Sequence, residues 1–208
     1  MKESSKGSRR SIGRGEKVRA AVLAATLEEL GGAGYAALTV ENVAQRAGVH
    51  KTTVYRRWKD RENLVVDALS EQIALEIPIP DTGAIATDLR ELARGFVRWA
   101  TSVSGQAVLA AVLSDALRIP EVVAARRRIF GDRLRRAEQV IRRAVERGEL
   151  PSDVDPAEVI KAMVAPLYLR LLITGEPLDR ASADHAARAA LAAARAGVLG
   201  RSGDRPAE

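Results

Sequence analysis

The chain has 208 residues, enough for one or two domains; 47% of them are hydrophobic and 29% are charged. That composition is typical of a folded globular protein and excludes a chain that is disordered throughout. The sequence has no cysteine, which excludes disulfides, thiolate nucleophiles and cysteine-ligated zinc. It has no long uncharged apolar run and no apolar segment behind its basic N-terminus, so we expect a cytoplasmic protein rather than a membrane or secreted one.

The positive charge is concentrated in the first third of the chain. Residues 1–66 hold 13 Lys and Arg against 7 Asp and Glu, whereas residues 67–208 hold 20 of each kind. This asymmetry predicts a head that binds a polyanion, with nucleic acid ahead of a membrane surface, on a neutral body. Residues 1–15 are basic and rich in Gly and Ser, and we expect a flexible basic arm there. The alternative for residues 1–12 is a disordered tail that only improves solubility.

The predicted elements of the head are four helices. The first has one apolar face, and the glycine-rich residues 31–34 are expected to end it. Thr39 should cap a short second helix, and a third is predicted from about Lys51 to Trp58. Asp60 should cap a fourth, which ends before the proline break at Pro78.

The rest of the chain also has helical periodicity and no alternating pattern typical of strands. Apolar residues spaced by four and three predict an amphipathic helix that Gly105 ends; they are Ile85, Leu89, Leu92, Phe96, Trp99 and Val103. A helix over about residues 107–117 follows. A long helix is then predicted from Pro120 to Arg147, with Gly148 directly after it. Asp155 should cap a helix that runs to Thr174, and a last helix covers about residues 180–198.

The pattern that indicates a function is a pair of short helices separated by a tight turn at Gly48 and Val49. Val54 and Trp58 can pack one face of the second helix inward, which leaves the opposite face for a nucleic-acid groove. Polar and basic side chains occupy that face, namely His50, Lys51, Thr52, Thr53, Tyr55, Arg56, Arg57 and Lys59. The major groove of B-DNA is about 12 Å wide and admits such a helix, so this segment is predicted to be a helix–turn–helix.

A more specific pattern extends over the same segment. It consists of Gly34-Tyr35, then Thr39-Val40 through Ala47-Gly48-Val49, then Thr53-Val54-Tyr55-Arg56-Arg57-Trp58. Over residues 16–66 this resembles the DNA-binding domain of the TetR family of repressors. The chain departs from the family pattern at Trp58, where Phe is usual, at Asp60-Arg61, where Ser-Lys is usual, and at His50, where a small capping residue is common. Residues 165–178 are similar, more distantly, to TetR regulatory domains of the actinobacterial type.

The resemblance implies an all-α, Ω-shaped homodimer whose chains have about nine helices. It places a helix–turn–helix domain at residues 16–62, a regulatory and dimerisation domain at residues 63–200 and a flexible tail at residues 201–208. The implied partner is a palindromic operator in double-stranded DNA, released when a small effector binds the regulatory domain. By position, phosphate contacts are implied for Thr39, Tyr55, Lys59 and Arg61, and major-groove contacts for His50, Lys51, Thr52, Thr53 and Arg56; Gln45 and Arg46 are also expected at the DNA.

Few large side chains lie outside the head. Phe96, Trp99, Phe130, Met163 and Tyr168 are the best candidates for the walls of an effector pocket, because such pockets are mostly apolar. For each of them plain core packing is the alternative. Pro166 is expected to kink its helix.

The last two helices favour a dimer interface. Residues 159–173 are apolar nearly all round, and the following helix has small residues that permit close packing, namely Ala186, Ala187, Ala189, Ala190 and Ala193. A four-helix bundle between two subunits satisfies both features.

Three classes of function compete. They are a ligand-responsive transcription regulator, a DNA-binding regulator whose body only dimerises or binds protein, and a helical enzyme. The sequence has no P-loop, no Gly-rich dinucleotide motif and no Cys/His nucleophile pair, and its two histidines, His50 and His185, are far apart. We therefore expect no enzyme, no cofactor and no metal site. The sequence leaves the first two classes open.

Overall fold

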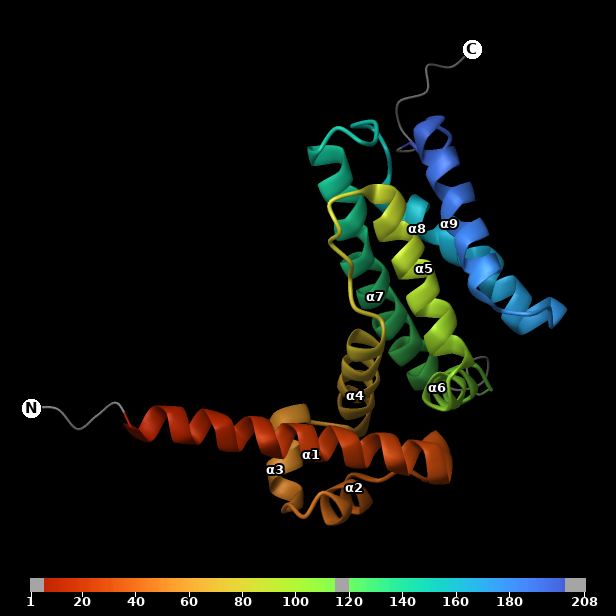
Figure 1. The fold of residues 1–208 in the computed structure, drawn as a ribbon. Helices are drawn as coiled ribbons and strands as arrows, with labels where there is room; N and C mark the ends of the chain where they lie inside the picture. Colours follow the sequence, from red (N-terminus) through yellow and green to blue (C-terminus); the bar gives the residue numbers. More distant parts are fainter. Residues whose placement is uncertain (1–5, 115–119, 201–208) are drawn as a thin grey trace, which may run out of the picture. The chain divides into compact units, whose positions relative to one another are not determined.

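The computed structural model describes residues 6–114 and 120–200, which are helical apart from loops and one isolated antiparallel bridge between Val154 and Gly200 (Figure 1). The helices are α1 (Lys6–Ala37), α2 (Val40–Arg46), α3 (Lys51–Trp58), α4 (Arg61–Glu76), α5 (Ile85–Thr101), α6 (Val103–Ser114), α7 (Pro120–Glu146), α8 (Pro156–Leu169) and α9 (Arg180–Arg195). No helix among these residues is long and apolar enough to cross a membrane.

The chain divides into two compact units. The first consists of Met1–Gln72 and Ala107–Ile129, and the second of Ile73–Gln106 and Phe130–Glu208. The helix–turn–helix segment belongs to the first unit. Helices α4, α6 and α7 have residues in both, so the boundary does not coincide with the ends of helices.

Helix α1 differs from the prediction at both ends. It begins at Lys6, so residues 6–15 are helical although a flexible arm was expected there; residues 1–5 lie outside the described part. At the other end Gly31 and Gly32 remain helical, and only Gly34 leaves the helical conformation, with φ 77° and ψ 171°. A glycine inside a helix costs about 1 kcal/mol relative to alanine but does not end it, whereas a positive φ interrupts the helix.

The predicted caps of the head are confirmed. The Thr39 hydroxyl accepts a hydrogen bond from the Asn42 backbone N–H at 3.1 Å, at the start of α2. Asp60 Oδ1 accepts from the Asn63 backbone N–H at 2.7 Å, at the start of α4. Both caps satisfy N–H groups that have no partner within the helix, and they fix where α2 and α4 begin.

The core of the second unit is built around α5, which packs against α9, while α8 packs on α9 as well (Figure 1). Apolar residues of α5 are buried along one stripe, among them Ile85, Leu89, Leu92 and Phe96. Helix α9 presents small side chains to them, with Ala183, Ala186, Ala187, Ala190 and Ala194 all buried. Alanine side chains permit close helix packing, and the burial of the apolar stripe supplies the main stabilisation of this unit.

The boundary between α5 and α6 was predicted wrongly. The sequence placed the end of α5 at Gly105, but the chain breaks at Ser102 and α6 begins at Val103. The Ser102 hydroxyl accepts from the Gly105 backbone N–H at 3.0 Å, which caps α6. A Cβ atom at Gly105 would collide with the Trp99 carbonyl oxygen. Gly105 therefore permits a tight turn between two helices and does not end one.

Helix α8 begins as predicted and ends earlier. Asp155 accepts from the backbone N–H groups of Ala157 and Glu158, at 2.8 and 3.4 Å. Pro166 lies within α8, and residues 170–174 form a π-helical turn before Gly175, which has φ 65°. Proline cannot donate a backbone hydrogen bond, yet α8 continues past Pro166 to Leu169, and the π-helical turn begins four residues after the proline.

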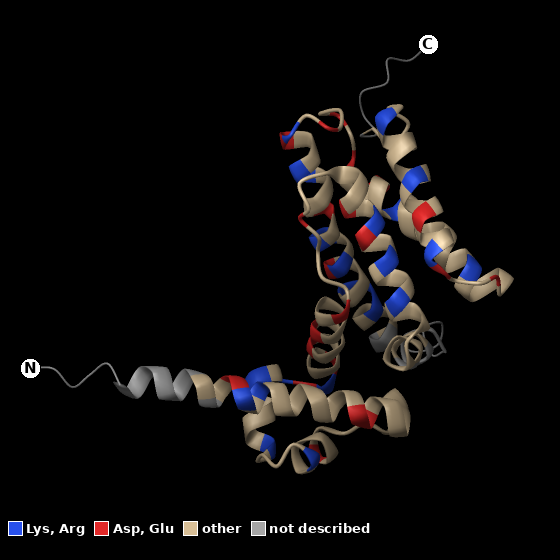
Figure 2. Ribbon diagram, viewed as in Figure 1, with Lys and Arg blue, Asp and Glu red and all other residues tan. Residues whose placement is uncertain are grey.

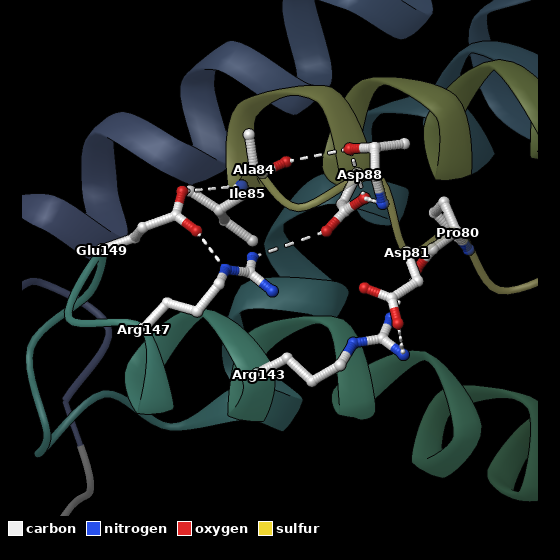
Figure 3. A network of polar contacts seen from close by, with 9 residues as sticks. Pro80, Asp81, Ala84, Ile85, Asp88, Arg143, Arg147 and Glu149 are labelled. Atoms are coloured by element: carbon white, nitrogen blue, oxygen red, sulfur yellow. Dashed lines mark hydrogen bonds and ion pairs between the residues drawn. The ribbon is translucent and has the colours of Figure 1, made fainter.

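A polar network ties the segment before α5 to the end of α7 (Figure 3). Asp88 is fully buried, and its Oδ1 accepts from the backbone N–H and the hydroxyl of Thr82, both at 2.7 Å. Its Oδ2 lies 3.6 Å from the Arg147 guanidinium. Glu149 accepts from Arg147 at 2.5 Å and from the Ile85 backbone N–H at 2.8 Å, which caps α5.

Candidate functional site

The helix–turn–helix is formed by α2, a four-residue turn and α3. Gly48 has φ 66°, a conformation that glycine adopts without strain, and the Val49 backbone N–H donates to the Ala44 carbonyl at 3.0 Å. Val43, Ala44 and Val54 are buried where the two helices meet the first unit's core. The turn and this packing fix the direction of α3.

Helix α3 has one buried and one exposed face. Val54 and Trp58 are buried, whereas Lys51, Thr52, Tyr55, Arg56 and Arg57 are exposed and Thr53 is half-buried. The helix has no acidic residue, and basic residues extend along it (Figure 2). An exposed helix face that carries cations and hydroxyl groups is what contact with a DNA groove requires.

His50 has a structural role at the start of α3. Its Nδ1 accepts from the Thr52 backbone N–H at 3.4 Å and lies 2.9 Å from the Thr52 hydroxyl. The imidazole thus acts as the N-cap, in place of the small capping residue that the family pattern usually has. The sequence departure at His50 therefore leaves the beginning of α3 intact.

Two of the arginines expected at the DNA make contacts within the first unit. Arg46 donates to Glu29 at 2.6 Å and to Glu28 at 3.2 Å, and these carboxylates raise the pKa of Arg46. Arg61 lies over the Tyr35 ring, with its guanidinium carbon 4.5 Å from the ring centre. Gln45, Thr39 and Lys59 are exposed beside α3.

Asp67 is a residue that sequence reasoning missed. Its carboxylate accepts from the Trp58 indole N–H at 2.8 Å and from Arg19 at 2.9 Å, and Arg19 also donates to Glu71 at 3.0 Å. These bonds join α1, α3 and α4 at the C-terminal end of α3. The sequence feature that could have identified Asp67 is a single carboxylate within an apolar run, Val65-Val66-Asp67-Ala68-Leu69.

Four of the five pocket candidates come together in the second unit. The ring centroids of Phe96 and Tyr168 are 4.9 Å apart, those of Phe96 and Trp99 6.0 Å, and those of Phe130 and Tyr168 6.3 Å. We call these four side chains the aromatic cluster. The fifth candidate, Met163, is fully buried on α8; it is not aromatic and is not part of the aromatic cluster.

The cluster has a cationic neighbour that sequence reasoning also missed. Arg133 lies one helical turn after Phe130 on α7 and is half-buried. Burial, the largest cause, and the nearby charge of Arg136 bring the pKa of Arg133 down to about 10, while the neighbouring Tyr168 acts in the opposite direction. Burial likewise raises the pKa of Tyr168. Both groups keep their ordinary protonation state at neutral pH, so a cation and a neutral phenol interact electrostatically here. Within the described residues no group of three or more His, Cys, Asp or Glu could hold a metal ion.

Comparison with known proteins gives a consistent result over both units. Residues 22–68 match the family model described as bacterial regulatory proteins, tetR family, and residues 79–190 match the tetracyclin repressor-like C-terminal domain. The chain is 37% identical to the HTH-type transcriptional regulator AqdR of Rhodococcus erythropolis, over 71% of this chain and 70% of that protein. It is 32% identical to the DNA-binding transcriptional repressor TetR of Mycobacteroides abscessus, over 82% and 90% of the two chains. The crystal structure of the TetR family transcription regulator SCO0332 superposes with a TM-score of 0.71 and 32% identity, over 85% of this chain and 97% of that one.

Proposed function

The chain belongs to the TetR family of bacterial transcriptional regulators, and from this premise we propose that it is a repressor that binds a palindromic operator as a homodimer and releases it when a small molecule binds the second unit. The family consists of DNA-binding regulators and not of enzymes. The observation that carries the proposal is the exposed face of α3, where Lys51, Thr52 and Arg56 are exposed while Val54 and Trp58 are buried on the opposite face.

The DNA contacts divide into two kinds. Lys51, Thr52, Thr53 and Arg56 are proposed to meet base edges, because arginine and lysine pair with guanine and hydroxyl groups reach either base. Thr39, Tyr55 and Lys59 are proposed to bind phosphates. The Thr39 oxygen already accepts from Asn42, yet its hydroxyl proton remains available to donate.

Arg46 and Arg61 have a different proposed role. Each is held by contacts within the first unit, to Glu29 and to the Tyr35 ring respectively. We infer that they act mainly by fixing the position of the helix–turn–helix, with any contribution to DNA affinity coming from their charge. Gln45 in α2 and His50 at the start of α3 are the remaining residues proposed to lie at the DNA.

The proposed dimer surface lies on α8, the π-helical turn and α9. Large apolar side chains are exposed there, with Leu169 52%, Leu172 46% and Ile173 76% accessible. Of the five expected alanines, Ala186, Ala187 and Ala190 are buried within the chain, Ala193 is half-buried and Ala189 is exposed. An exposed apolar stripe of this kind favours a self-complementary interface, and members of the family act as dimers.

Ligand response is proposed to act through α7. Its first part belongs to the first unit, where Arg128 donates to Asn63 at 2.8 Å near the start of α4. Its later part carries Phe130 and Arg133 in the second unit. A ligand that binds one conformation of α7 more tightly than another changes the affinity for the operator. The change cannot exceed the difference between the ligand's binding free energies for the two conformations.

The test is selection of binding sites from random double-stranded DNA with the full chain. We expect one enriched palindrome whose half-sites are about one helical turn apart or a multiple of it. A matched selection with Thr52→Ala plus Arg56→Ala should lose that palindrome while the variant stays folded by circular dichroism. Enrichment of a sequence without two-fold symmetry, or of none, would contradict the proposal.

A further inference from the structure

All the aromatic residues of the second unit lie in one place. The sequence has seven Phe, Trp and Tyr residues, and the four that fall in this unit are the aromatic cluster, Phe96, Trp99, Phe130 and Tyr168. They come from three helices, α5, α7 and α8. The rest of this core is aliphatic and rich in alanine. Aromatic rings packed at steep angles to one another are thus concentrated where three helices meet.

A polar atom inside the cluster has no partner. Trp99 is only 2% accessible, and its indole Nε1 is buried without a hydrogen bond in the described part of the chain. Buried indole N–H groups usually find an acceptor, because leaving one unpaired forfeits the bond it made with water. A ligand with an acceptor would restore that bond.

Among the described residues, the cation beside the cluster also has no counter-ion. No carboxylate of the described residues forms an ion pair with Arg133, although acidic residues occur on the same helix. Asp132 pairs with Arg135 and Glu138 pairs with Arg142. A half-buried guanidinium without a partner is costly and attracts an anion, and its planar fork matches a carboxylate.

We propose that the aromatic cluster and Arg133 form the effector site and that the effector is an amphiphilic carboxylate, with its apolar body against the rings and its carboxylate on Arg133. The Tyr168 hydroxyl supplies a second donor to the carboxylate, and the Trp99 indole N–H binds an acceptor elsewhere on the ligand. This inference rests on the proposed ligand response and adds the chemical class of the ligand. A carboxylate ligand gives the unpaired guanidinium of Arg133 a function, whereas a purely apolar ligand would leave it without one.

The test uses matched probes that differ only in charge. Calorimetric titration of the full chain compares benzoate with benzamide, 2-naphthoate with 2-naphthamide and octanoate with octanamide. We expect at least one carboxylate to bind at least tenfold more tightly than its amide. Arg133→Gln should abolish that preference, whereas Arg133→Lys should keep it and Arg127→Gln, an exposed arginine of the same helix, should leave it unchanged.

Two controls keep the result interpretable. Arg133→Gln removes an unpaired, half-buried charge and is expected to melt no lower than the wild-type protein, so loss of binding will not reflect unfolding. The indole N–H resonance of Trp99, assigned with Trp99→Phe, should move on addition of the bound carboxylate in wild-type protein. A resonance that does not move would overturn the role given to Trp99.

The outcomes separate this inference from the proposed function. If amides bind as tightly as carboxylates, if no probe binds, or if Arg133→Gln keeps the preference, the carboxylate site is overturned and ligand response stays open to other molecules. If the preference depends on Arg133 but the bound carboxylate leaves operator affinity unchanged, the site stands and the proposed ligand response fails at this site. Release of operator together with Arg133-dependent binding supports both.

Discussion

The indole N–H of Trp58 donates a hydrogen bond of 2.8 Å to Asp67, and this bond fixes the last residue of α3 to the middle of α4. Trp58 is 5% accessible, so its ring is a core residue and its N–H needs an acceptor. The same carboxylate holds Arg19 on α1. Asp67 therefore helps to hold α3 in its orientation from outside that helix, in addition to the turn and the packing of α2 and α3.

Replacing that side chain should destabilise the first unit. Asp67→Ala leaves the Trp58 N–H unpaired and frees Arg19, and we expect the free energy of unfolding to fall by about 1–3 kcal/mol. Urea unfolding followed by circular dichroism measures it. Glu71→Ala removes only the more exposed half of the Arg19 pair and should cost less than about 1 kcal/mol. Equal effects of the two substitutions would show that the indole hydrogen bond is unimportant.

Lys59 offers a test in which stability and DNA affinity change in opposite directions. It is the one non-glycine residue of the described chain with positive φ, at 63°. Lys59→Gly should relieve this strain and raise stability by about 1 kcal/mol. It should also weaken binding to all DNA sequences alike and reduce the salt slope of log affinity by about 0.9, the value for one lost phosphate contact. Lys59→Ala should give the same DNA effect without the gain in stability. An unchanged salt slope in both variants would exclude the phosphate contact.

The residues proposed at base edges should behave differently from Lys59. Thr52→Ala and Arg56→Ala, tested singly, are expected to reduce discrimination at one base pair of each half-site by about 1–3 kcal/mol. Binding to a panel of operators with single base changes measures this effect. A uniform loss across the panel would instead assign these two side chains to the phosphates.

The dimer surface can be tested with a single charge. Leu169→Glu puts a carboxylate on the exposed stripe of α8, and we expect monomers in sedimentation experiments and a loss of operator affinity of at least tenfold. Val103→Glu is the matched control, since Val103 is also exposed, at 88%, but lies on α6. A Leu169→Glu protein that remains dimeric would locate the interface elsewhere.

The carboxylate of Glu149 gives a pH-dependent contribution to stability. The backbone N–H of Ile85 and the Arg147 guanidinium hold the pKa of Glu149 below its ordinary value of 4.5. A lowered pKa stabilises the fold at pH values above 4.5, and the contribution disappears as the pH falls through the folded-state pKa. Glu149→Gln should therefore be less stable than wild type at pH 7 and lose less stability between about pH 5 and pH 3. Urea unfolding at a series of pH values measures both slopes, and parallel slopes would contradict the assignment.

Features that depend on neighbouring residues in the chain were predictable. The caps at Thr39, Asp60 and Asp155 follow from a short polar side chain placed before an apolar run, and the structure confirms all three. The exposed face of α3 follows from the spacing of Val54 and Trp58. These interactions span a few residues, so the sequence pattern alone contains the information.

Features that depend on partners far along the chain were not predictable. Asp67 acquires its role from Trp58 and from Arg19, which is 48 residues away. Arg133 resembles its neighbouring arginines in sequence, and only the folded chain shows that Asp132 and Glu138 pair with others. The α5–α6 break was misplaced because the close approach of the Trp99 carbonyl to Gly105 depends on the folded backbone.

The gathering of Phe96, Trp99, Phe130 and Tyr168 has a spectroscopic consequence. Aromatic rings held in a fixed asymmetric environment produce near-ultraviolet circular dichroism, which disappears when that packing loosens. Because the second unit has no other Phe, Trp or Tyr, its whole near-ultraviolet signal comes from this one cluster. Tyr35, Tyr55 and Trp58 supply the signal of the first unit, so replacing Trp58 by Phe leaves Trp99 as the single tryptophan chromophore of the protein.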